Sequence, residues 1–173
     1  AVLSALEFTD IGSISGREPW ASNGTPGGTR LLKDIYAGGS NSDLAGFTAL
    51  GNGRAIFWAA DPANGAEVWV TDGTAAGTLL LRDIYPGSST SAPGGLTALG
   101  NGRAIFWAAD PINGNEVWIT DGTPAGTQLL KDINPGGGGS NSGGMTALAN
   151  GKAIFWATSA SSGNEVWVTA GTP

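Results

Sequence analysis

A 49-residue repeat constrains the fold of this chain more than any other feature. Four tryptophans are spaced by 49 residues, and each follows a glutamate by two positions: Trp20, Trp69, Trp118 and Trp167 follow Glu18, Glu67, Glu116 and Glu165. The segment Ala-Ile-Phe-Trp-Ala recurs with the same spacing, and 173 residues divided by 49 give about 3.5 copies. Such a period indicates units that bury their apolar surface against their neighbours.

Each copy is predicted to form four short strands separated by turns. In the copy with the clearest pattern, the expected strands are 96–99, 104–109, 116–120 and 127–133. The second of these is apolar on both faces, which is typical of a strand covered by other layers on both sides. Turn-forming Asp, Asn, Pro and Gly residues lie between the segments.

Four strands in 49 residues, with periodic glycine and tryptophan, predict an all-β fold, namely a β-propeller built from four-stranded blades. A β-solenoid is the alternative, and it is disfavoured because its rungs are shorter and have fewer hairpin turns. The chain is interpreted as a single repeat domain, 1–173. It divides into a degenerate first blade with its connector (1–46), two blades (47–95 and 96–144) and an incomplete last blade (145–173).

The two end copies are atypical. The segment 3–6 is interpreted as a remnant of the first strand of the first copy, and the last copy stops before a fourth strand. A missing strand leaves an edge that must be covered. We therefore expect either that other protein chains, copies of this chain or different ones, complete the end blades, or that the chain is part of a longer array. A monomeric four-bladed ring closed by the incomplete end blades is the remaining alternative.

Charge and composition exclude several functions. A net charge of −6 with eight Lys and Arg residues argues against a nucleic-acid partner, because binding polyphosphate needs a basic face. Without Cys or His, a Ser-His-Asp or Cys-His site is impossible. No apolar run is long enough for a membrane span. A carboxylate pair for glycan hydrolysis has candidates only in Glu7 and Asp10 of the first copy, so we expect no enzyme.

Opposite charges are expected to face each other across the hairpin of the third and fourth strands. A turn centred between Thr74 and Ala75 places a glutamate opposite a basic residue, and the same arithmetic holds in the other copies. Such cross-strand pairs contribute about 0.2–1 kcal/mol each, which gives the repeated glutamate a structural interpretation. The three pairs are Glu18 with Lys33, Glu67 with Arg82, and Glu116 with Lys131.

Two sets of recurring residues are candidates for ligand binding. Asp61, Asp72, Asp110 and Asp121 offer oxygen ligands, so calcium is the one cofactor that the residues admit. No Asp-x-Asp-x-Asp-Gly run is present, and an aspartate that caps its own turn explains them without an ion. Trp20, Trp69, Trp118 and Trp167 are candidates for sugar-stacking platforms, one per blade, although packing between blades is preferred.

The motif at 67–78, followed by 80–84, resembles the bacterial ELWxxDGT repeat family, with Val68 in place of the usual Leu. The next copy, 116–133, resembles it equally, whereas the end copies carry Asn23 and Ala170 where Asp72 stands. The resemblance covers nearly the whole chain. It implies large secreted or surface proteins with propeller-like repeat arrays and no established catalytic residue.

These observations together predict a location and a role. We expect an extracellular, periplasmic or cell-surface bacterial protein. It would act as a non-catalytic structural or interaction module within a larger assembly. A multivalent carbohydrate-binding propeller is the alternative, and a glycan hydrolase is the weaker one.

Overall fold

A computed structural model describes residues 16–172 of the chain. The segment 3–6 and the residues Glu7 and Asp10, singled out above, lie outside the described residues. Within that range the chain is all-β, with thirteen strands and two three-residue 3-10 turns, η1 (Pro26–Gly28) and η2 (Ala149–Gly151). The described part holds no helix of the length and apolar character that a bilayer span requires.

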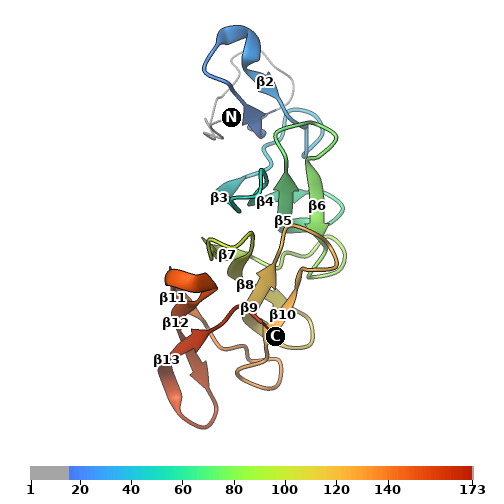
Figure 1. Ribbon diagram of the computed structural model, residues 1–173. Helices are drawn as coiled ribbons and strands as arrows, with labels where there is room; N and C mark the ends of the chain where they lie inside the picture. Colours follow the sequence, from blue (N-terminus) through green and yellow to red (C-terminus); the bar gives the residue numbers. More distant parts are fainter. Residues whose placement is uncertain (1–15, 173) are drawn as a thin grey trace.

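The strands form four separate antiparallel sheets (Figure 1). The first copy contributes a two-stranded sheet, the two central copies contribute four-stranded meanders, and the last copy contributes three strands. In order, the strands are β1 (Trp20–Ala21) and β2 (Arg30–Leu31); β3 (Ala45–Ala49), β4 (Ala55–Asp61), β5 (Gly65–Thr71) and β6 (Leu79–Arg82); β7 (Gly94–Ala98), β8 (Ala104–Asp110), β9 (Gly114–Thr120) and β10 (Gln128–Lys131); and β11 (Gly143–Ala147), β12 (Ala153–Ser159) and β13 (Gly163–Thr169).

The expectation of four antiparallel strands per copy is confirmed for the two central copies. Each unit is a meander, so its strands pair with their neighbours in sequence. A solenoid would instead stack equivalent strands of successive rungs in parallel. The described sheets therefore disagree with the solenoid alternative.

The sheets stack face to face into an open arc (Figure 1). The first strands of successive units, β3, β7 and β11, lie along one side, and the fourth strands β6 and β10 lie along the other. The core lies between consecutive sheets: Ile56 and Val68 of one sheet pack with Phe106 and Trp118 of the next. Each central sheet thus buries both faces, which explains the doubly apolar second strand.

Two glycines bring the first strand of a unit close to the tryptophan of its second strand. A Cβ on Gly95 would lie 1.9 Å from Cζ3 of Trp107, and its φ of +63° favours glycine. The β7–β8 register shifts between Gly94 and Thr97 at the same place. The first strand therefore begins at Gly94, two residues before the predicted start at Leu96.

The predicted charge pairs across the hairpins of the two central copies are wrong. Next to the turn the pairing is as expected, with Trp69 opposite Leu80, but a bulge then shifts the register so that Arg82 faces Val68. A bulge places two residues against one, and a count of positions does not reveal it. The same shift puts Lys131 opposite Val117 instead of Glu116, while Glu18 and Lys33 lie beyond the paired residues of β1 and β2.

Two of the three basic residues of these pairs, Lys33 and Arg82, contact the following copy. The Arg82 guanidinium lies 5.4 Å from the ring centroid of Trp118, and the Lys33 ammonium lies 5.9 Å from that of Trp69. Arg82 Nη1 also donates to the carbonyl oxygen of Thr127 at 2.6 Å. A cation over an aromatic face is attracted to it, so each basic side chain helps to hold its unit against the next.

Candidate functional site

The recurring glutamate anchors the connector between two units. Glu67 is buried, and its Oε2 accepts hydrogen bonds from the Ile84 amide at 3.1 Å and from Ser91 Oγ at 2.6 Å. Its Oε1 accepts from the amides of Tyr85 and Ser91, both at 3.1 Å. One carboxylate therefore fixes the backbone directly after β6 and, seven residues later, the approach to β7.

The same anchor occurs in the copies on either side. Glu18 accepts from the amides of Ile35 at 2.8 Å and Tyr36 at 3.3 Å, and Glu116 accepts from Ile133 at 3.2 Å and Asn134 at 3.1 Å. Glu165, the equivalent residue of the last copy, is exposed. The glutamate is thus structural, as the sequence indicated, but its partners are backbone amides and not basic side chains.

Burial sets the titration of these carboxyl groups. It raises the pKa of Glu67 above its ordinary value, because desolvation outweighs the hydrogen bonds from Ser91 and the backbone that favour the charged form. Burial raises the pKa of Glu18 and Glu116 in the same way. By contrast, the Thr74 hydroxyl lowers the pKa of Asp72, and the Thr123 hydroxyl lowers that of Asp121.

These opposite shifts predict greatest stability in mild acid. A Glu67 pKa raised on folding contributes stability that is fully present below the unfolded pKa and is lost as pH rises through the folded value. The lowered pKa of Asp72 acts the other way, since its contribution is lost as pH falls through the folded value. We therefore expect the denaturant midpoint to rise modestly as pH falls from about 7 to about 5, and to fall again below about 4.

Urea unfolding at a series of pH values measures this dependence. Glu67→Gln removes one titrating group, so its urea midpoint should depend less on pH between about pH 5 and 7 than the wild-type midpoint does. Asp72→Asn is the control. Because the pKa of Asp72 is lowered, this change should alter the pH dependence of the midpoint only in stronger acid. A wild-type midpoint that stays constant or declines from pH 7 to 5 would contradict the raised pKa values.

The candidate calcium ligands cap their own turns. Asp72 Oδ1 accepts from the Thr74 amide at 2.9 Å and its hydroxyl at 2.6 Å, and Asp121 makes the same contacts with Thr123. Asp61 and Asp110 each accept from the amides two and three residues ahead, at 2.7–2.8 Å. These bonds account for the recurring aspartates.

The candidate carboxylates also lie apart from one another. Asp61 and Asp72 lie beyond opposite ends of β5, so the two do not share a site. Among residues 16–172, no three His, Cys, Asp or Glu side chains are grouped closely enough to hold a metal ion. Calcium binding stays a prediction that only a binding measurement tests.

The tryptophans of the Glu-x-Trp motif are packing residues in the central copies. Trp69 and Trp118 are buried between sheets, and their Nε1 atoms donate to the carbonyls of Ala59 at 3.2 Å and Ala108 at 3.1 Å. Rings held in this way are not available to stack on a sugar. Trp20 and Trp167 are half-buried, one at each end of the described arc.

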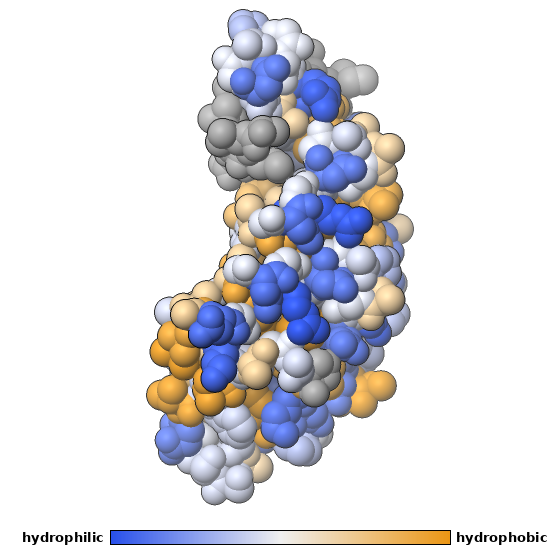
Figure 2. Space-filling view, viewed as in Figure 1, coloured by the Kyte–Doolittle hydropathy of each residue, from blue (hydrophilic) through white to orange (hydrophobic). Residues whose placement is uncertain are grey.

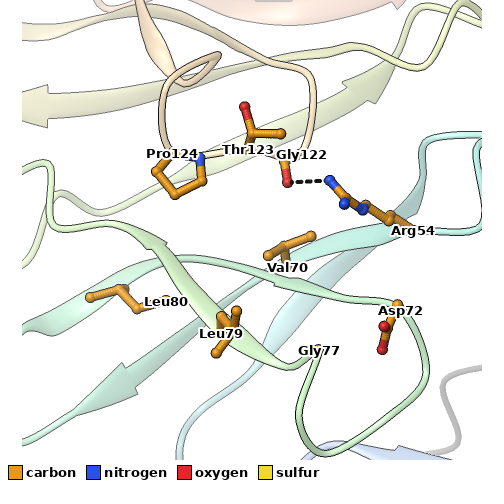
Figure 3. A pocket seen from close by; sticks show the side chains of 9 residues that line it. All are labelled: Arg54, Val70, Asp72, Gly77, Leu79, Leu80, Gly122, Thr123 and Pro124. Atoms are coloured by element: carbon orange, nitrogen blue, oxygen red, sulfur yellow. Dashed lines mark hydrogen bonds between the residues drawn. The ribbon is translucent and has the colours of Figure 1, made fainter.

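A small pocket of about 210 Å³ lies between one unit and the next (Figure 3). Val70, Leu79 and Asp72 of the second copy line it, together with the turn at Gly122. Arg54 Nη1 spans the gap and donates to the Gly122 carbonyl at 3.1 Å. Its one carboxylate and one guanidinium are both engaged in structural bonds, so the pocket has no pair of free groups for acid–base chemistry.

The arginine clasp recurs in the next unit, where Arg103 donates to the Gly171 carbonyl, and Lys152 stands at the equivalent position of the last copy. Arg30, which stands at a different position of its own copy, donates to the Gly73 carbonyl and joins the first copy to the second. The clasp residues and the anchor serines were not predicted from the sequence, although the 49-residue spacing of Ser42, Ser91 and Ser140 is a signal that identifies the serines.

The last sheet exposes a face that the preceding sheets bury. Val166 is 78% exposed, whereas its equivalents Val68 and Val117 are 0% exposed, and Val168 is 66% exposed, whereas its equivalents Val70 and Ile119 are buried. Trp156 of β12 and Leu148, directly after β11, are also exposed large hydrophobic residues. Figure 2 shows hydrophobic side chains gathered over this sheet, at the lower left of the view. An incomplete last blade was expected from the sequence, but this apolar patch was not.

A scan against models of known protein families found no match, and searches of curated proteins and of solved structures found no similar chain. The resemblance to the ELWxxDGT repeat family therefore rests on the sequence motif alone.

Proposed function

We propose that this chain is a non-catalytic interaction module of the β-propeller type, related to the ELWxxDGT repeat proteins. It acts in an extracellular, periplasmic or cell-surface assembly of a bacterium. The observation that carries the proposal is the exposed apolar face of the last sheet, because a further unit or a protein partner would bury Val166 and Val168 as their counterparts are buried. A contiguous apolar patch of this kind is typical of a protein–protein contact.

The recurring polar residues support a structural role. Glutamate, aspartate and arginine are engaged in each central copy by backbone groups of the same or the next unit. A catalytic site would instead require a polar group that is free to contact a substrate and that occurs in one copy only. Burial of exposed apolar side chains is therefore the main favourable contribution that the described surface can make to binding. Fully burying a valine or similar side chain contributes about 1.5–3 kcal/mol.

Multivalent carbohydrate binding is the second candidate. A groove of about 380 Å³ between the two central units is lined by Arg82, Asp110, Asn113 and Trp118. The guanidinium, the carboxylate and the amide are the kind of polar groups that orient a ligand in many sites, whereas the Trp118 ring is buried and does not serve as a stacking surface. A glycan array, probed with calcium and then with a chelator, tests this candidate. Binding at several equivalent sugar sites would favour the carbohydrate-binding function. If the folded chain binds no glycan under either condition, the interaction module is favoured.

Association through the last sheet is the direct test of the proposed function. We expect the wild-type chain to associate in a concentration-dependent way in sedimentation experiments. The double variant Val166→Lys/Val168→Lys should associate at least about tenfold more weakly, because two charges then replace apolar contacts. Its thermal midpoint should change little, since both side chains are already exposed.

Ile112→Lys is the matched control. Ile112 is 77% exposed in the turn between β8 and β9, away from the last sheet, and the same change there should leave association unaltered. A wild-type chain that remains monomeric at all concentrations, or a double variant that associates as strongly as the wild type, would contradict the proposed interaction surface.

A further inference from the structure

Asparagine followed by glycine recurs along the chain. Six such pairs lie at turns, and they are 23–24, 52–53, 64–65, 101–102, 113–114 and 150–151. Asparagine is thermolabile because the backbone nitrogen of the next residue attacks its side-chain carbon, and glycine obstructs that attack least. Since the six pairs share this chemistry, their surroundings in the fold decide which of them reacts.

The reaction converts an amide into a carboxylate in two steps. First, the glycine nitrogen forms a bond to the asparagine Cγ and the Cγ–Nδ2 bond breaks. The proton of the glycine amide passes through solvent to the departing nitrogen, which leaves as ammonia. Water then opens the five-membered succinimide ring at one of its two carbonyl carbons, which gives aspartate or isoaspartate. Water is the only co-reactant, so the fold must supply an accessible nitrogen and space for the ring.

The surroundings of Asn52 supply both. Asn52 and Gly53 are exposed in the turn between β3 and β4, and a Cβ built on Gly53 would have no atom within 4 Å. No group of the described residues accepts a hydrogen bond from the Gly53 amide. The nitrogen is therefore open to hydroxide, and the ring has room to form.

The Arg54 amide activates the carbon that is attacked. It donates a hydrogen bond to Asn52 Oδ1 at 3.2 Å. Attack on Cγ places negative charge on this oxygen, and a donor aimed at developing charge lowers the barrier to its formation. The bond that closes the turn therefore also favours the reaction.

Asn64 and Asn113, in the turns between the second and third strands, are protected. Asn64 Nδ2 donates to the two carboxylate oxygens of Asp61 at 3.0 and 2.8 Å, and Asn113 Nδ2 donates to Asp110 at 2.8 Å. A carboxylate next to the amide disfavours the negative charge that develops during the attack. The glycines that follow begin β5 and β9, and the backbone of a connector lies against each of them.

The other three pairs each lack a feature that Asn52 has. The Gly24 amide already donates to Ser22 Oγ at 3.1 Å, so its nitrogen is engaged. The amide group of Asn101 lies against Gly151 of the next copy, where it would overlap a Cβ. Gly151 is itself buried, which shields the nitrogen that follows Asn150.

We propose that Asn52 is a site of spontaneous modification, at which the side-chain amide is converted to aspartate and isoaspartate faster than at the other Asn-Gly pairs. The product carries one additional negative charge. That charge lies at the junction of the two central units, because a Cβ on Gly102 of the next copy would be 3.5 Å from Asn52 Nδ2. The inference goes beyond the proposed interaction function and does not depend on it.

Timed incubation of the full, folded chain in warm, mildly alkaline buffer tests the proposal. Trypsin cuts after Lys and Arg, which places Asn52, Asn64, Asn101 and Asn113 in four separate peptides. Mass spectrometry follows the amide-to-acid change in each peptide, and an unincubated sample corrects for conversion during digestion. We expect Asn52 to convert at least about tenfold faster than Asn64 and Asn113.

The same incubation in guanidinium chloride separates the fold from the local sequence. In the unfolded chain Asn64 and Asn113 lose their carboxylate partners, and Asn52 loses the bond from Arg54. The Asn-Gly pairs should then convert at similar rates, and the tenfold difference should disappear.

Two variants identify the groups responsible. Asn52→Gln should leave its peptide unconverted, because glutamine would have to form a larger ring, and this also distinguishes Asn52 from Asn41 in the same peptide. Asp61→Asn removes the charge next to Asn64 and should speed conversion there about threefold or more, while Asn52 keeps its rate. Asp110→Asn makes the same test at Asn113, and circular dichroism verifies that each variant is folded.

Three results would overturn the proposal. In the folded chain, these are an Asn52 that stays intact and an Asn64 or Asn113 that converts as fast as Asn52. The third is a difference between the pairs that persists in denaturant, because the neighbouring sequence and not the fold would then set the rates.

Discussion

Trp118→Ala is expected to destabilise the chain by about 3–5 kcal/mol, the range for removing a large aromatic side chain from a packed core. The ring is 4% exposed and lies between the two central sheets, where it packs with Ile56 and Val68. The variant also loses the Nε1 bond to the Ala108 carbonyl and the stacked Arg82 guanidinium. Since whole domains are stable by only about 5–15 kcal/mol, urea unfolding followed by circular dichroism should show a large shift.

Trp156→Ala is the matched control. Trp156 is 44% exposed on the last sheet, so the same truncation should cost much less, about 1 kcal/mol. Equal losses in the two variants would contradict the packing assigned to Trp118. A Trp118→Ala chain that keeps wild-type stability and loses only glycan binding would transfer support to the carbohydrate-binding alternative.

Repetition is the reason why much of the fold is predictable from the sequence. The 49-residue spacing, the turn residues and the doubly apolar segment at 104–109 together indicate four strands per copy, and β7 to β10 lie close to the predicted ranges. Local turn chemistry and apolar periodicity are properties of each segment itself. They are therefore visible without knowledge of the neighbours.

Features that depend on three-dimensional packing were not predictable in this way. The bulges opposite Val68 and Val117 shift the register by one residue, and counting positions assumes that there is none. The predicted charge pairs fail for this reason. The glutamate was interpreted as structural, but its donors lie 17 to 24 residues further along the chain, in a connector that lacks the apolar alternation of a strand.

The exposed face of the last sheet could not be predicted from the sequence for the same reason. Residues 67–70 and 165–168 have the identical sequence Glu-Val-Trp-Val, yet Val68 is buried and Val166 is exposed. The difference lies in what residues 16–172 place next to each strand, which is another sheet and a fourth strand beside β5 and neither of these beside β13. A segment's own residues therefore indicate which face is apolar, but only the arrangement of the units shows which face is free to bind.

Glu67→Ala is expected to cost about 3 kcal/mol or more at neutral pH. Truncation removes the acceptor of the buried Ile84 amide and of the Tyr85 amide, and an unsatisfied buried donor costs about 1–3 kcal/mol. The variant also frees the Ser91 hydroxyl from its 2.6 Å bond. Because the carboxylate joins two points of one connector, its loss should loosen the packing between the two central sheets, and urea unfolding at pH 7 measures the loss.

Glu165→Ala provides the control, because this glutamate stands in the same four-residue motif but is exposed. The expected change is within about 0.5 kcal/mol. Hydrogen exchange separates the anchor from a general effect of the side chain: in Glu67→Ala the amides of Ile84 and Tyr85 should exchange much faster than those of β4, whose ladder bonds are intact. Equal stability losses in the two variants would show that the glutamate acts through its own strand and not through the connector. The units would then be held together by apolar packing and the arginine clasps alone.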